Sequence, residues 1–398
     1  MGTVADSATG EPLPFVNIIF KGSSVGITTN FDGEYSIETN NASDTLLASF
    51  IGYERMSAKV LKGKFQIIDF KMKAQFIQLE DVIIRPGVNP AEIIFDSIIA
   101  NKPNNDPDNL ESYEYEAYTK IELDANNITE KFQSRKIYKP FEFIFQYVDT
   151  STVNGKTYLP IFLSETISNV YTRKNPKGYL EKIKASKISG FNNKSAMQLL
   201  GDEYLNTNIY DNYIDVFQLH FVSPIANGGL SSYKYYLVDS ASFDGKWCYK
   251  LMFKPRHKQT LTFTGNMWVH DTTFAIREIE MHIANDANMN FVNDLVINKS
   301  FEIINGNRWV LTRDYTIADF NITENNKRTV GFFGKKTTTC RNYIINQPKA
   351  PSFYNSPVNV LVSDSADLHN DKYWLENRHE NLTKDESTIY YMIDTLTT

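Results

Sequence analysis

Three turn-forming elements in the first forty residues decide the fold of the N-terminal region. They are Thr9-Gly10-Glu11-Pro12-Leu13, Lys21-Gly22 and Asp32-Gly33-Glu34-Tyr35. Glycine, proline and aspartate mark tight turns, and the runs between them alternate apolar and polar residues. In Asp32-Gly33 the glycine supplies the positive φ that a hairpin turn needs. The pattern predicts short antiparallel strands packed as a small β-sandwich.

These elements resemble the carboxypeptidase-regulatory-like module, a transthyretin-type sandwich of the seven-strand type, and Phe50-Ile51-Gly52-Tyr53-Glu54 extends the match. The resemblance implies a non-catalytic accessory domain, which in its families often lies at the periplasmic end of outer-membrane proteins. We assign residues 1–80 to this module. The next segment, Leu79-Glu80-Asp81-Val82-Ile83-Ile84, resembles the one that follows the module in TonB-dependent transporters. It also fits a last strand with an exit linker.

Composition limits the fold and the function. A chain of 398 residues predicts two or three domains. Its 23 tyrosines and 26 phenylalanines favour β structure, so we expect a mainly β protein with some α, of the α+β class. The net charge of −6 argues against a nucleic-acid partner, which requires a basic face. No run of about 18 apolar residues is present, so the sequence predicts no membrane-spanning helix.

Residues 81–110 form a linker and a helix. Asn89 is a good N-cap, Pro90 suits the first helical position and Glu92 suits the first turn. We expect the helix to end near Lys102, before Pro103.

The stretch Tyr113–Leu123 alternates strictly and predicts a half-buried antiparallel strand. Glu114, Glu116 and Glu122 fall on its polar side, which we interpret as a solvated face, although a glycosidase would also need paired carboxylates. The helix and strand together resemble the opening of an uncharacterised Bacteroidota-type family. In that family the regulatory-like module is fused to a domain of unknown function, and typical members continue into a C-terminal outer-membrane β-barrel. The resemblance spans the whole chain and implies membrane anchoring of the parent protein.

Residues 111–347 form an α+β domain built on a long meander. Its expected strands are Tyr233–Phe243, Lys246–Lys254, Thr260–His270, Ala275–Ala284, Val296–Ile304, Arg308–Phe320 and Thr329–Ile345. Consecutive long strands predict a large curved antiparallel sheet or half-barrel. We expect residues 171–215 to be partly helical, with helices near 196–205 and 209–217.

One hairpin of the meander, Phe263–Val269 with Phe274–Glu280, resembles the periplasmic lipoprotein carriers. The resemblance implies an open barrel with an apolar concave face. Six aromatic or sulfur-containing side chains are the candidates for lining a ligand on that face. They are Tyr235, Phe263, Met267, Trp268, Phe291 and Trp309.

Residues 348–398 are expected to form a loop and a final helix that leads toward the barrel. The helix begins at a capping box, Thr383-Lys384-Asp385-Glu386.

Met1 directly precedes the first strand, so we expect that a leader peptide was removed, and that the chain is cut short after the last helix. The expected location is the periplasmic side of the outer membrane or the cell surface. Repeated Asp-Ser and Asp-Thr dipeptides, which resemble Bacteroidota O-glycosylation acceptors, agree with export but also suit ordinary turns.

Motifs for chemistry are scarce. The sequence contains no His-Glu-x-x-His, no Gly-x-Ser-x-Gly, no P-loop and no dinucleotide-binding glycine pattern, and we expect no cofactor. Two metal hypotheses stay open: zinc at scattered histidines such as His270 and His282, and calcium at the oxygen-rich stretch from Asp286 to Asp294. The two cysteines, Cys248 and Cys340, either form one bridge or are small buried side chains.

The leading hypothesis is a non-catalytic, periplasm-facing region of an outer-membrane-associated protein. It would bind an apolar ligand, a lipid or an envelope protein partner. The alternatives are an envelope hydrolase acting on glycan or peptide, and a structural spacer for a barrel.

Overall fold

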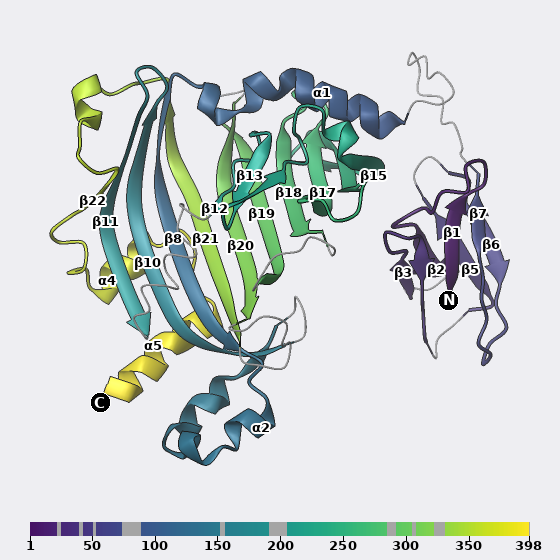
Figure 1. Cartoon of the computed structure of the whole chain (residues 1–398), viewed down its shortest axis with the longest axis horizontal. Helices are drawn as coiled ribbons and strands as arrows, with labels where there is room; N and C mark the ends of the chain where they lie inside the picture. The colour runs from purple at the N-terminus through teal and green to yellow at the C-terminus, as the bar shows by residue number, and fades with distance from the viewer. Residues whose placement is uncertain are drawn as a thin grey trace.

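The computed structural model describes residues 1–21, 25–39, 43–50, 53–73, 89–151, 156–190, 205–284, 292–304, 308–321 and 331–397. Strands dominate, helices are few, and small N-terminal sheets precede one large curved sheet, which confirms the predicted fold class (Figure 1). Several sequence predictions lie outside the described residues. They concern Leu79-Glu80-Asp81-Val82-Ile83-Ile84, the helix predicted from residue 196, Phe291 and most of the oxygen-rich stretch.

The N-terminal module contains two small sheets. The strands are β1 (Gly2–Asp6), β2 (Asn17–Phe20), β3 (Gly26–Thr28), β4 (Glu34–Tyr35), β5 (Thr45–Ser49), β6 (Met56–Lys59) and β7 (Phe70–Met72). They pair in the orders β4-β1-β7 and β3-β2-β5-β6, and Val4, Ile18 and Met72 are fully buried between the sheets. Gly33 has a φ of +74°, and a Cβ there would lie 2.5 Å from the carbonyl oxygen of Val4. The predicted turn therefore requires this glycine.

Helix α1 (Pro90–Asn105) follows the module. The Asn89 side chain accepts a hydrogen bond from the Ala91 N–H, as the N-cap prediction requires. The predicted end was three residues too early, because Pro103 lies inside the last turn. The helix ends instead at Asn105, and its C-cap Asp106 donates its N–H to the Lys102 carbonyl.

In the part of the chain that the structure describes, the large sheet has twelve strands, and all but one of its pairings are antiparallel. Its order is β15 (Tyr233–Phe243), β16 (Lys246–Pro255), β17 (Phe263–His270), β18 (Ile276–Ile283), β19 (Val292–Ile304), β20 (Arg308–Asn321), β21 (Gly331–Ile345), β8 (Ser112–Asn126), β10 (Thr157–Arg173), β11 (Gly178–Gly190) and β22 (Val360–Val362). The short strand β9 (Asp149–Thr150) pairs with β10. All seven predicted meander strands are confirmed.

The prediction of a partly helical region between 171 and 215 was wrong where the structure describes it. Strands β10 and β11 occupy its first part, and residues 213–216 form β13 instead of a helix. Both faces of β10 are largely buried, so its sequence lacks the alternation that marks a half-exposed strand. Pro160 sits beside a register shift in β10, where a strand tolerates proline.

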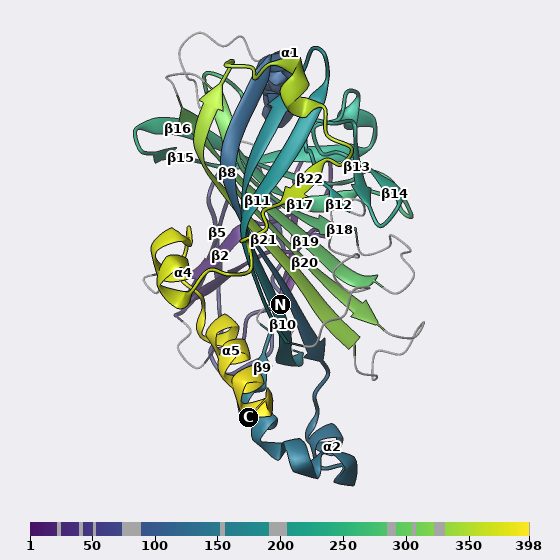
Figure 2. The same cartoon turned by 90° about the vertical axis from the view of Figure 1, so that its left-hand side faces the viewer.

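Different elements cover the two faces of the sheet. Helix α1 and a small sheet of β12 (Leu205–Asn206), β13 (Tyr213–Val216) and β14 (Leu219–Val222) pack on one face, called here the α1 face. Helices α4 (Asp371–Asn377) and α5 (Lys384–Thr397) cover the other, the α5 face, and Figure 2 shows α5 and β14 on opposite sides of the sheet. Two shorter helical segments, α2 (Glu130–Gln133) and the 3-10 turns at Lys136–Tyr147, follow β8. Within the described ranges no helix is long and apolar enough to cross a membrane.

The capping box of α5 forms as the sequence predicts. The Thr383 N–H donates to Glu386 Oε2 at 2.6 Å, and the Glu386 N–H donates to Thr383 Oγ1 at 3.2 Å. Each residue thus satisfies a backbone donor at the helix start.

Thr383→Ala removes the hydroxyl half of this box. We expect it to lower the free energy of unfolding by about 1 kcal/mol. Thr383→Ser, which keeps the hydroxyl, is the matched control and should stay close to the wild type. Urea denaturation followed by circular dichroism measures both, and equal losses for Ala and Ser would show that the hydroxyl does not contribute.

Candidate functional site

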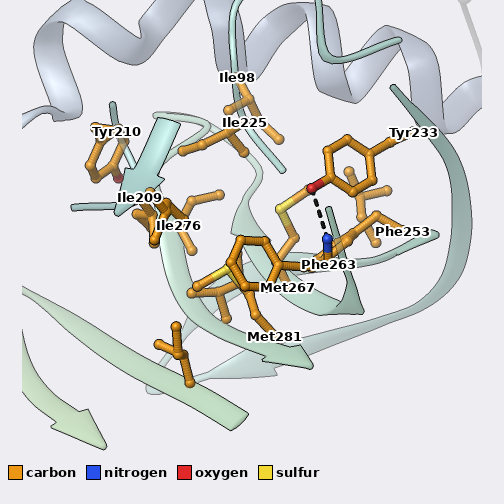
Figure 3. Close-up of a cluster of buried hydrophobic side chains, with 14 of the residues drawn as sticks. Ile98, Ile209, Tyr210, Ile225, Tyr233, Phe253, Phe263, Met267, Ile276 and Met281 are labelled. Carbon is orange, nitrogen blue, oxygen red and sulfur yellow. Dashed lines mark hydrogen bonds between the residues drawn. The ribbon is translucent and has the colours of Figure 1, made fainter. Parts of the chain in front are cut away.

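The α1 face carries a large apolar core. Side chains of α1, β13 and β14 pack there onto strands β15 to β20, and most are fully buried. Figure 3 shows Ile98 and Ile225 above Phe263, Met267 and Met281. The Tyr233 hydroxyl accepts a hydrogen bond of 3.0 Å from the Phe263 N–H. The hydroxyl of Tyr210, in the same cluster, is buried without a well-directed hydrogen bond among the described residues.

The structure brings four of the six predicted ligand-lining residues together. Tyr235, Phe263, Met267 and Trp309 belong to this core, with exposed fractions of 1, 0, 0 and 6%. The ring of Phe95 from α1 lies over Tyr235, with 4.5 Å between the ring centroids. Trp268, the residue after Met267, points to the opposite face and packs edge-on against Phe243. A ligand would reach the four core residues only if α1 or the β12–β14 sheet moved away.

The α5 face carries buried charge, which the sequence analysis did not anticipate. The even-numbered residues of β8 point to this face, and Lys120, Glu122 and Asp124 are 2, 6 and 0% exposed. The interpretation of the polar side of β8 as a solvated face was therefore wrong for Glu122. Glu116, on the same side, forms ion pairs with Lys184 and Arg341. The reason is that the C-terminal helices lie over this side of β8, while the neighbouring strands β11 and β21 supply the partners Lys184, Lys335 and Arg341.

Glu165 is the first centre of this charge. It is fully buried in β10, and its carboxylate accepts hydrogen bonds of 2.5 and 2.7 Å from the Arg378 guanidinium. The Tyr118 hydroxyl donates at 2.7 Å, and the Tyr390 hydroxyl of α5 donates to the other carboxylate oxygen. Burial opposes ionisation of Glu165, but these hydrogen bonds outweigh it and hold its pKa below the ordinary value.

Lys120 is the second centre. Its Nζ lies 2.5 Å from Glu386 of α5 and 2.7 Å from Glu380. Burial lowers the pKa of Lys120, but the two carboxylates outweigh this effect and raise it. Glu386 therefore caps α5 and joins α5 to the sheet at once.

Lys335 is the third centre. It lies opposite Glu122 in the β8–β21 register, with its Nζ 3.4 Å from that carboxylate and 2.8 Å from Asp124 Oδ2. Burial opposes the charge on Lys335, but the two carboxylates outweigh it and raise its pKa. Neither oxygen of Asp124 has a well-directed hydrogen bond among the described residues, so its attraction to Lys335 is mainly one of charge. Lys335 therefore joins β21 to β8 within the sheet. We call the six residues of the first two centres, which join the sheet to the C-terminal segment, the ionic network. They are Tyr118, Lys120, Glu165, Arg378, Glu386 and Tyr390.

The pKa of Glu122 is raised from the ordinary 4.5 to about 8. Burial is the largest cause, the charge of Lys335 opposes it, and Asp124 and Glu386 add to it. A carboxyl whose pKa is raised on folding binds its proton more tightly in the folded state. Its contribution to stability is thus present below pH 4.5 and is lost as the pH rises through about 8. We expect Glu122→Gln, which mimics the protonated form, to weaken this loss and to be more stable than the wild type at about pH 9. Urea denaturation across the pH range tests this, and parallel pH profiles for the two proteins would contradict it.

Among the described residues, the other candidate chemical groups do not assemble into a site. Cys248 and Cys340 are both buried and unbridged. The nearest partner of His270 is the Thr273 hydroxyl, and that of His282 is Glu280. In the part of the chain that the structure describes, no group of three or more histidine, cysteine or acidic side chains is placed to hold a metal ion. No sequence motif signals the ionic network, although the unusually charged alternation of β8 marks one of its strands.

Comparison with known sequences identifies two parts of the chain. Residues 94–343 match a family described as "Family of unknown function (DUF5686)". The chain belongs to this family. Residues 1–84 match the CarboxypepD_reg-like domain, as the sequence resemblance predicted, so the fusion of module and uncharacterised domain is confirmed.

Curated relatives match a minor part of the chain. A TonB-dependent receptor of Formosa agariphila is 37% identical over 75 residues, which cover 19% of this chain and 7% of the receptor. The TonB-dependent receptor SusC of Bacteroides thetaiotaomicron is 31% identical over 110 residues, which cover 26% of this chain and 10% of SusC. The matched parts are therefore a small fraction of these relatives.

Solved structures resemble the chain only weakly. A DUF1329 family protein from Desulfovibrio piger aligns with 67% of this chain and 98% of its own, at 12% identity and a TM-score of 0.28. A LolA superfamily protein from Nitrosomonas europaea aligns with 68% and 99%, at 10% identity and a TM-score of 0.23. At such scores these similarities assign neither a fold nor a function to the chain.

Proposed function

We propose that this chain is a non-catalytic scaffold of the cell envelope that holds its C-terminal helices in a fixed position on a large sheet. The observation that carries the proposal is the ionic network, which joins β8 and β10 to α5 and to Arg378 at the end of α4. If the parent protein carries the barrel that the sequence resemblance implies, the network would set how the sheet meets it. An envelope protein partner would dock on the same rigid unit.

An exported location on the periplasmic side of the outer membrane, or at the cell surface, belongs to this proposal. It is supported by the similarity of part of this chain to TonB-dependent receptors. We extend this location from those relatives to the present chain.

The packing on the α1 face favours a scaffold over a carrier. A lipid carrier needs an apolar space open to its ligand, whereas the four predicted lining residues that share the core are 6% exposed or less. Apolar-ligand binding remains a second candidate because Phe263, Met267 and Met281 form the kind of adaptable apolar surface that lipids bind. It requires that α1 act as a movable cover.

Buried carboxylates with raised pKa values are also what an envelope hydrolase would use. Here Glu122 and Asp124 lie within 3.4 Å of Lys335 and beneath α5, which provides a structural reason for their burial. The position of the pair favours the scaffold over the hydrolase.

Native mass spectrometry of the purified chain, with extraction of any copurifying lipid, separates scaffold from carrier. Phe95→Ala removes the ring over Tyr235 and loosens the cover, and Leu375→Ala, at an exposed position of α4, is the matched control. The scaffold predicts a mass without lipid for all three proteins. A stoichiometric lipid on the wild type, or one gained by Phe95→Ala alone, would overturn the scaffold in favour of the carrier.

A further inference from the structure

Strand β22 is an uncovered edge of the large sheet. Val360, Leu361 and Val362 are 43, 37 and 62% exposed, so both faces of the strand are open. No charged residue occurs between Pro351 and Ser363. Exposed apolar edges without charges are templates for pairing with another strand.

The backbone of β22 presents free groups in a defined pattern. The Asn359 carbonyl accepts from the Glu181 N–H at 2.8 Å, and the Ser363 N–H donates to the Ile183 carbonyl at 3.0 Å. Because backbone groups alternate in direction along a strand, those of Val360 and Val362 point away from β11. Among the described residues β22 pairs with β11 alone.

We infer that β22 pairs with β22 of a second copy of this chain, antiparallel and about a two-fold axis at Leu361. In this register Val360 of one copy faces Val362 of the other, and both pairs exchange backbone hydrogen bonds. Leu361 faces its own counterpart as a non-hydrogen-bonded pair. The contact is isologous and closed, as in most homodimers. The inference goes beyond the scaffold role and does not depend on it.

Charges at the two ends of the edge fit this arrangement. Asp364 and Asp367 are exposed in the turn that follows β22, whereas Lys174 and Lys177 are exposed in the turn between β10 and β11. The latter turn lies at the other end of the edge, because Tyr354 packs on Gly178. Antiparallel pairing therefore places the acidic end of each copy near the basic end of the other. The contact is small compared with the roughly 1,200 Å² of a stable interface, so we expect a weak dimer that high salt weakens further.

Sedimentation velocity over a wide range of protein concentration tests the dimer. The wild type should show a dimer fraction that rises with concentration. Val362→Pro removes one outward N–H without touching the bonds to β11, and should weaken self-association by about tenfold or more. Val362→Thr keeps the N–H and should still dimerise. Two results would overturn the inference. One is a wild type that is monomeric at every concentration, which would leave the edge to a strand of another polypeptide. The other is a Val362→Pro variant that dimerises as strongly as the wild type.

Cross-linking tests the register independently. Opposed residues in a non-hydrogen-bonded pair lie about 4.5 Å apart between Cα atoms, within the range that a disulfide spans. Leu361→Cys should therefore form a disulfide-linked dimer under mild oxidation. Val358→Cys is the control, because the two copies of that residue would lie about 20 Å apart. The native Cys248 and Cys340 are buried and should not react. Equal cross-linking of the two variants, or none for Leu361→Cys, contradicts the register.

Discussion

Replacing Glu165 by alanine is expected to lower the free energy of unfolding by about 3–5 kcal/mol. The carboxylate is fully buried, and its removal leaves the Arg378 guanidinium without a counter-charge on a face where its side chain is only 11% exposed. The hydroxyls of Tyr118 and Tyr390 lose their acceptor at the same time. Because one of these donors lies in α5 and the guanidinium follows α4, the loss should appear first in the C-terminal helices.

Urea denaturation of Glu165→Ala measures this loss. The matched control is the double variant Glu165→Leu with Arg378→Met, which removes both charges and fills the space with apolar groups. We expect the double variant to recover most of the stability, since an apolar replacement of a buried ion pair is often neutral. If Glu165→Ala lowers the free energy of unfolding by less than about 1 kcal/mol, the loss is that of an exposed ion pair. The hydrogen bonds at Glu165 would then contribute little to stability.

Lys335→Met is expected to lower the free energy of unfolding by a comparable amount, about 3–5 kcal/mol, at a pH above neutrality. Methionine matches the aliphatic part of lysine but leaves Glu122 and Asp124 buried without the cation that lies 3.4 and 2.8 Å from them. Both carboxyl pKa values, already raised by burial, should rise further, because Lys335 is the group that lowers them. The variant should therefore recover stability as the pH falls and both carboxyls bind protons.

Unfolding of Lys335→Met at pH values above and below neutrality checks the sign of this effect. Adding Glu122→Gln and Asp124→Asn to Lys335→Met removes the uncompensated charges and should restore stability at the higher pH. If Lys335→Met loses the same stability at every pH, the cost comes from packing and not from the buried carboxylates.

The sequence predicts those elements that local patterns determine. The turn at Asp32-Gly33, the Asn89 cap and the Thr383 capping box each depend on neighbours within four residues, and all three form. The meander strands were predicted because each has its own alternation and ends at a turn.

Features that depend on distant segments escaped prediction. Glu122 appears solvated from its strand alone, because its cover, α5, begins more than 250 residues later in the chain. The half-buried lysines of β11 and the shortness of β22 gave no strand signal, because these strands form through pairing with their neighbours. The ligand-lining prediction for Trp268 failed to separate the two faces, since adjacent residues of a strand point in opposite directions.

Hydrogen exchange of the backbone amides in α5 tests the central claim most directly, which is that the ionic network fixes the C-terminal helices to the sheet. The account predicts that amides in the first turns of α5 exchange as slowly as those of β8, because both open only when the whole domain unfolds. In Glu165→Ala the α5 amides should exchange much faster while β8 stays protected. Rapid exchange of α5 in the wild type, beside a protected β8, would contradict the account.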